Sequence, residues 1–154
     1  MARRTDRAGR ARTLSRRLAT QALYQWQLTG QGAADLRNQY ASAEGYGEAD
    51  GDHFAALVDG VTASSARLDD ELSGLVDRPV TQLDPIEHAI LLIGLFELGQ
   101  CPEVPYRVVI NEGVDLAKRF GATEGHKFVN AVLDRAARLL RATERSAASG
   151  TTRD

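Results

Sequence analysis

Cysteine is almost absent from this sequence, which contains Cys101 alone. A single thiol cannot form a disulfide within the chain, which favours a reducing compartment. Long apolar runs are missing as well: the longest, 89–98, is interrupted by Gly94 and Glu97 and is too short to cross a bilayer. No apolar segment follows the arginine-rich start, so no signal peptide is expected. These absences predict a soluble, cytoplasmic protein without a membrane span.

Catalytic and metal-binding signatures are also missing. None of the three histidines, His53, His88 and His126, has a second histidine or cysteine at metal-ligand spacing. The sequence has no phosphate-binding glycine loop, nucleophile elbow or dinucleotide fingerprint. Cys101 has no neighbouring base that would activate it as a nucleophile. We therefore expect a protein that is not an enzyme and that needs no metal or cofactor.

The charge is unevenly distributed, although the formal net charge is only −2. Residues 1–17 carry seven arginines and one acid, a net charge of +6. Residues 35–103 carry three basic and fourteen acidic side chains, a net charge of −11, whereas residues 104–154 carry nine basic and six acidic ones, a net charge of +3. Two basic ends around an acidic middle predict one surface for a polyanion and another for a cationic partner.

Apolar residues recur at helical spacing along most of the chain, and no segment gives a convincing strand. Helices are expected over 13–28, 33–43, 52–76, 85–98, 105–120 and 123–140, and the small residues around 60–65 could divide the third in two. The fold class is therefore all-α, a compact bundle of about seven helices in two packed antiparallel sub-bundles. We predict one helical domain, 13–142, between flexible tails at 1–12 and 143–154, which lack periodic apolar positions.

The clearest helix start is the segment Asp84-Pro85-Ile86-Glu87. It places an acid at the N-cap, proline at the first helical position and glutamate three residues after the cap. The residues that follow are apolar on most sides of a helix, so this segment is expected to form a central buried helix.

The first predicted helix has a row of polar residues spaced by three or four, which places them on one face. The row consists of Arg12, Arg16, Thr20, Tyr24 and Gln27, with Thr13 and Arg17 beside it. The preceding tail adds Arg3, Arg4, Arg7 and Arg10. Arginine binds phosphate bidentately and stacks on bases, so this surface predicts binding of single-stranded RNA, with Tyr24 stacking on an unpaired base. The alternative is that the arginine-rich end only keeps the chain soluble.

Several motifs resemble those of the NusB family. Ala22-Leu23-Tyr24-Gln25-Trp26-Gln27-Leu28, after an arginine-rich start, resembles that family's first-helix motif. A C-terminal signature follows in the family's order: Val104-Pro105-Tyr106, Ile110-Asn111-Glu112, Leu116-Ala117-Lys118, Phe120-Gly121-Ala122 and His126-Lys127-Phe128-Val129-Asn130. The helix at 87–98 also matches, so the resemblance spans about residues 10–140.

The resemblance implies an all-helical protein that binds the boxA element of nascent RNA together with NusE, a small-subunit ribosomal protein. The assembly helps RNA polymerase to read through terminators, notably in ribosomal RNA operons, and no cofactor is implied. On this chain the RNA surface would comprise the N-terminal arginines, Tyr24, Lys127 and Phe128, although the spacing of Phe128 also suits burial in the core. Glu87 and Glu97, on the helix that the family presents to NusE, would bind that cationic partner.

Two positions depart from the family pattern. Leu92 stands where family members carry arginine, which would remove one phosphate contact, and Glu124 stands where the shorter aspartate occurs.

Two alternative functions stay open. One is an RNA-recruitment domain of an rRNA-modifying methyltransferase, although the sequence has no methyl-donor-binding segment. The other is an RNA-independent helical adaptor or homodimer, in which the arginine face would be buried.

Overall fold

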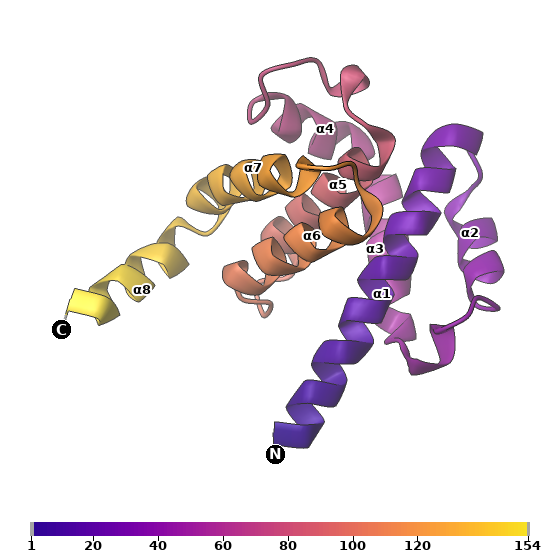
Figure 1. The fold of residues 1–154 in the computed structure, drawn as a ribbon, viewed down its shortest axis with the longest axis horizontal. Coiled ribbons are helices and arrows are strands. Elements are labelled where there is room, and N and C mark those ends of the chain that lie inside the picture. Colours follow the sequence, from indigo (N-terminus) through magenta and orange to yellow (C-terminus); the bar gives the residue numbers. More distant parts are fainter. Residues whose placement is uncertain (1, 154) are drawn as a thin grey trace.

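Eight α-helices and two short 3-10 helices make up the computed structural model, which describes residues 2–153 and the side chains of residues 6–147 (Figure 1). The α-helices are α1 (Ala2–Thr29), α2 (Ala33–Tyr40), α3 (Gly51–Ala63), α4 (Ser65–Ser73), α5 (Pro85–Gln100), α6 (Tyr106–Phe120), α7 (Gly125–Leu140) and α8 (Ala142–Arg153). The 3-10 helices are η1 (Tyr46–Glu48) and η2 (Val80–Gln82). Residues 2–153 contain no strand, and the all-α prediction is confirmed.

The predicted start of α5 is confirmed in atomic detail. One carboxylate oxygen of Asp84 accepts hydrogen bonds from the backbone N–H groups of Ile86, at 2.9 Å, and Glu87, at 3.1 Å. Asp50 caps α3 in the same way, by accepting from the N–H of His53 at 3.0 Å. These carboxylates satisfy N–H groups that have no partner within the helix, which fixes where α3 and α5 begin.

The helices form two groups that share α5. In the first group α1 packs against α2 and α3; in the second, α6 and α7 pack against each other and against α5. Helix α5 contacts both groups and is buried on most sides, because nine of its 16 residues are buried, as its apolar sequence predicts. The two sub-bundles of the prediction are therefore present, with α5 at their junction (Figure 1).

The two ends of the chain differ from the sequence-based expectation. Helix α1 begins at Ala2 and α8 covers Ala142–Arg153, so the backbone is helical through most of the segments 1–12 and 143–154, where no helix was predicted. Alanine and arginine are strong helix formers, so a helix extends through segments that have no apolar stripe. Both ends project from the bundle in Figure 1, the first turns of α1 in indigo and α8 in yellow. The boundaries of the folding domain stay a prediction.

Glycines bring α5, α6 and α7 close together around Leu133. A Cβ atom added to Gly94 of α5 would lie 2.5 Å from Cδ2 of Leu133, and one added to Gly113 of α6 would lie 2.6 Å from Cδ1. Such distances are too short for any real contact, so the two glycines create the space that the fully buried leucine fills.

In the part of the chain that the structure describes, no helix is long and apolar enough to cross a membrane.

Candidate nucleic-acid interface

The N-terminal half of α1 presents part of the predicted basic surface. Arg7 and Arg10 are exposed, while Arg12 is half-buried and lies 3.5 Å from a carboxylate oxygen of Asp50. The side chains of Arg3 and Arg4 lie outside the described residues. The exposed arginines carry no ion pair with a described side chain, so their positive charge is available to a polyanion.

Arg16, placed on the same face by the sequence, lies instead inside the protein. Its side chain is 3% exposed and makes a two-pronged ion pair with Glu97 of α5, with both N–O distances at 2.8 Å. A third nitrogen donates to Glu112 of α6, also at 2.8 Å, and Thr13 donates to the same Glu112 oxygen at 2.5 Å. His53 of α3 lies 3.1 Å from the second oxygen of Glu97. We call Arg16, Glu97, Glu112 and His53 the buried polar cluster.

The buried polar cluster corrects two sequence-based assignments. The face expected to present Arg16 and Thr20 to RNA is buried at both residues, because α3, α5 and α6 pack over it. Glu97, expected on a surface for the cationic partner, is also buried, and Arg16 supplies its opposite charge within the chain. Neither residue is accessible to RNA or a second protein in this structure. Both hold helices together instead.

The charges in the buried polar cluster stabilise one another. Burial alone would raise the pKa of Glu97, but hydrogen bonds from His53 and Arg16, together with their charges, outweigh it and lower the pKa below its usual value. Burial likewise acts to lower the pKa of Arg16, but the bonds and charges of Glu97 and Glu112 hold it above the ordinary arginine value. The pair is therefore ionised in the folded protein at neutral pH.

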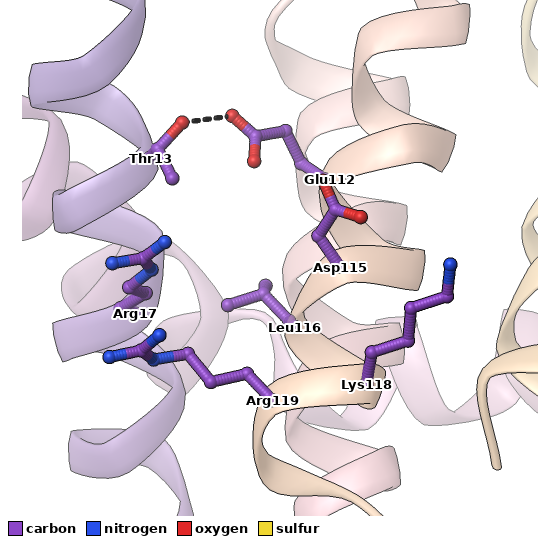
Figure 2. Close-up of a pocket in the computed structure, with 7 residues that line it drawn as sticks. All are labelled: Thr13, Arg17, Glu112, Asp115, Leu116, Lys118 and Arg119. Atoms are coloured by element: carbon purple, nitrogen blue, oxygen red, sulfur yellow. Dashed lines mark hydrogen bonds between the residues drawn. The ribbon is translucent and has the colours of Figure 1, made fainter.

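The exposed cationic face of α1 is rotated by about 100° from the predicted one, which is the turn that one residue makes in a helix. Its residues, at spacings of three and four, are Arg10, Leu14, Arg17 and Gln21, of which Arg10 and Gln21 are exposed and Leu14 and Arg17 are half-buried. Beside it, α6 contributes Lys118 and Arg119. Figure 2 shows Arg119 extending from α6 toward α1, below Arg17 in this view, with Thr13 bonded to Glu112 at the top.

Two adjoining cavities follow this face. The first, of about 280 Å³, is lined by Thr13, Arg17, Glu112, Asp115, Leu116, Lys118 and Arg119. The second, of about 290 Å³, is lined by Leu14, Arg17, Leu18, Gln21, Glu44, Gly45, Arg119 and Phe120. Arg17 and Arg119 line both cavities, so the two cavities adjoin at these residues, and we call the pair of cavities the α1–α6 groove.

The start of α7 brings together several other predicted residues. The ring of Phe128 is half-buried, and the guanidinium of Arg78 lies 4.6 Å from its centre. Lys127 is exposed and forms an ion pair with Glu124. A Cβ atom on Gly125 would lie 2.6 Å from Oε2 of Glu87, so the first turns of α5 and α7 are in contact there. Phe128 is thus neither in the core nor free, because Arg78 already covers part of its ring.

Tyr24 and Glu87 lie near this end of the molecule. Tyr24 is 36% exposed, so its ring is open on one side. One turn further along α1, Gln27 donates a 2.8 Å hydrogen bond to the carbonyl of Pro85, which joins the end of α1 to the start of α5. Glu87 is half-buried, and burial, with the nearby charge of Asp84, raises its pKa while Arg78 acts in the opposite direction.

The two departures from the family pattern have different structural settings. Leu92 is fully buried in the core, so it makes no surface that a phosphate could reach. Glu124 has a positive φ of 73° at the N-cap of α7 and is exposed beside Lys127. Residues other than glycine rarely adopt this backbone conformation, which indicates a locally strained turn before α7.

Cys101 is expected to react slowly with thiol reagents. Burial, with the negative charges of Glu97 and Glu103, raises the pKa of this thiol to about 11. Because the thiolate is the reactive form, the native protein should react with Ellman's reagent about 100-fold more slowly than a free cysteine at about pH 8. The urea-unfolded protein, in which burial is lost, provides the control. Equal rates for the native and unfolded protein would contradict the burial of this thiol.

Sequence reasoning missed three cations that the structure places beside residues of this interface. Arg78 reaches Phe128 from the loop between α4 and α5, while Lys118 and Arg119, at the end of α6, line the same cavity as Arg17. The adjacent pair Lys118-Arg119 was a visible signal, but only the packing of α6 beside α1 places it near the arginines.

Among the described side chains, no group of three or more histidine, cysteine and acidic residues is arranged to hold a metal ion.

Comparisons with known proteins agree with the architecture. Residues 13–138 match the model of the NusB family. The transcription antitermination protein NusB of Halorhodospira halophila is 50% identical over 139 residues, covering 89% of each chain. That of Paraburkholderia phymatum is 48% identical over 139 residues, covering 90% of this chain and 96% of its own. The solved structure of T. maritima NusB, at 22% identity, covers 82% of this chain and 89% of its own with a TM-score of 0.71, a likeness in fold. The resemblance seen in the sequence motifs is confirmed, and this chain belongs to the NusB family.

Proposed function

We propose that this protein is a transcription antitermination factor that binds boxA-type single-stranded RNA together with the ribosomal protein NusE. In this role it promotes read-through by RNA polymerase in ribosomal RNA operons, in the cytoplasm, by binding and not by catalysis. The observation that carries the proposal is the match of about nine tenths of this chain to relatives that are transcription antitermination proteins at about half identity.

The exposed arginines of α1 support the RNA half of this function. Arg7 and Arg10 offer exposed positive charge on a helix that projects from the bundle, where a flexible RNA strand can reach them (Figure 1). Tyr24 offers an open ring for stacking. At the start of α7, Lys127 and Phe128 add a cation and an aromatic, which RNA would contact in exchange for Glu124 and Arg78. Arg12 can exchange its weak contact with Asp50 for a phosphate, while Arg16 acts indirectly by holding α1 in place.

The acidic middle of the sequence supports the proposed binding of NusE. Glu87 stands at the accessible start of α5, where it could pair with a basic side chain of NusE. Asp69 and Asp77, exposed or half-exposed around α4 and the loop after it, extend the negative charge. Glu97 does not belong to this surface because it is buried against Arg16.

The proposal is tested by fluorescence anisotropy with a labelled boxA-containing RNA and a scrambled RNA of equal length, each titrated with and without NusE. We expect tighter binding to the boxA RNA and a further gain when NusE is present. Arg7→Gln combined with Arg10→Gln should weaken binding to both RNAs and reduce the slope of log K against log salt by about 1.4, which is about 0.7 for each lost phosphate contact.

Two results would count against this function. Equal affinity for the boxA and scrambled RNAs, with no effect of NusE, would leave only a basic helical domain. A dimer that excludes RNA, detected by analytical ultracentrifugation with and without RNA, would instead favour an RNA-independent adaptor.

A further inference from the structure

We propose that the α1–α6 groove is a binding site for the phosphate backbone of the RNA, with Arg17 of α1 and Arg119 of α6 on its two sides. This inference rests on the proposed function and extends it to a part of the surface outside the RNA-binding residues expected from the sequence. Arg10 and Lys118 stand near the groove and add positive charge.

The position of the two arginines carries the proposal. Arg17 and Arg119 come from different helices and line both of the adjoining cavities, so one bound phosphate could contact both (Figure 2). Guanidinium groups bind phosphate through two parallel N–H bonds, and a pair of them facing one groove suits a phosphodiester. The cavities of about 280 and 290 Å³ leave room for a nucleotide backbone.

The charges in the groove are not neutralised from within the described part of the chain. Arg10, Arg17, Lys118 and Arg119 make no ion pair with any described side chain, and the guanidinium of Arg119 rests 5.7 Å from the ring centre of Phe120. Of the acids on the walls, Glu112 is already bonded to Arg16 and Thr13. Asp115 and Glu44 remain, so the cations outnumber the available acids at the groove.

RNA fits this groove better than an acidic segment of a protein does. The groove continues the arginines of α1, from the exposed Arg7 and Arg10 to the half-buried Arg17, so a single strand could follow one helix face through several phosphates. Its inner end offers the half-buried ring of Phe120 and the amide of Gln21, which are an aromatic edge and a hydrogen-bonding group suited to a base.

The test compares the wild-type chain with the double variant Arg17→Gln, Arg119→Gln. The matched control is Arg37→Gln, Arg67→Gln, which removes the same charge from exposed side chains of α2 and α4 that only form surface ion pairs. Each protein is titrated with boxA and scrambled RNA by anisotropy at several salt concentrations. Circular dichroism confirms that each variant is folded.

Loss of two phosphate contacts should weaken binding by about 25-fold at about 0.1 M salt and lower the salt slope by about 1.4, because each contact to a single strand contributes about 0.7 to that slope. The control should bind within about twofold of the wild type after allowance for long-range charge. If the wild type binds boxA RNA and the groove variant keeps the same affinity and salt slope, the proposed phosphate site in the groove is wrong. The proposed function is then unaffected. Failure of the wild type to prefer boxA RNA would overturn the proposed function, while a loss in the groove variant would still support the phosphate site.

Discussion

Replacing Arg16 with methionine is expected to lower the free energy of unfolding by about 3–5 kcal/mol, because it leaves the buried carboxylate of Glu97 without its main partner. The side chain of Arg16 is 3% exposed and that of Glu97 1% exposed, so water cannot replace the lost contact. Glu112 loses its hydrogen bond from Arg16 at the same time. Urea denaturation followed by circular dichroism measures the change.

Arg17→Met, one residue along the same helix, is the matched control. Arg17 has no ion pair with a described side chain and lines an open groove, so its loss should change stability by no more than about 0.5 kcal/mol. Adding Glu97→Gln to Arg16→Met should recover part of the lost stability, because the unpaired charge is removed. Equal stability of the two methionine variants would show that the buried polar cluster does not hold the fold together.

The buried polar cluster also predicts how stability depends on pH. Although burial acts to raise the pKa of Glu97, hydrogen bonds from His53 and Arg16 lower it in the folded state. Glu97 therefore stabilises the fold above its unfolded pKa, about 4.3, and this contribution is lost as the pH falls through the folded pKa. Glu97→Gln should lose less stability than the wild type when the pH is lowered below about 4.

Replacing Leu133 with alanine is expected to have the second large effect, a decrease of about 2–5 kcal/mol in the free energy of unfolding. Leu133 is fully buried and fills the space that Gly94 of α5 and Gly113 of α6 leave open. Removing its branched end leaves a cavity where three helices meet, and helices cannot close on it without moving their backbones. Thermal and urea unfolding would both detect the loss.

Gly94→Ala has two opposite effects on stability: a clash with Leu133 and a gain in helix propensity. Making the change with and without Leu133→Ala separates them. In the wild type, Gly94→Ala should destabilise the protein by about 1–3 kcal/mol, since its methyl group would meet Leu133 at 2.5 Å. In the Leu133→Ala background the same change should stabilise α5 by up to about 1 kcal/mol, because alanine is the better helix former.

Gly99→Ala is the control within the same helix. No atom outside the surrounding turns of its own helix lies within 4 Å of the position that its Cβ would take, so only the gain in helix propensity remains. Additive effects of Gly94→Ala and Leu133→Ala would mean that the two residues are not in the close contact described here.

The all-α fold and most helix boundaries could be predicted because they depend on local sequence. The helical spacing of apolar residues indicates which faces are buried, and the start of α5 depends on the side chain of Asp84, two and three residues from the N–H groups it binds. The family, and with it the proposed RNA and NusE partners, was visible in motifs such as 22–28 and 126–130. Arg7, Arg10 and Tyr24 are exposed as expected.

Only the tertiary structure decided which arginine of α1 faces water. In sequence, Arg16 and Arg17 are equivalent polar residues, and helical spacing placed Arg16 on the outer face with Tyr24. The partners that bury Arg16 are Glu97 and Glu112, 81 and 96 residues away, and they reach it only after α5 and α6 pack on α1. Because a charge can be buried only where opposite charge meets it, its position depends on contacts between distant segments, which local periodicity does not contain.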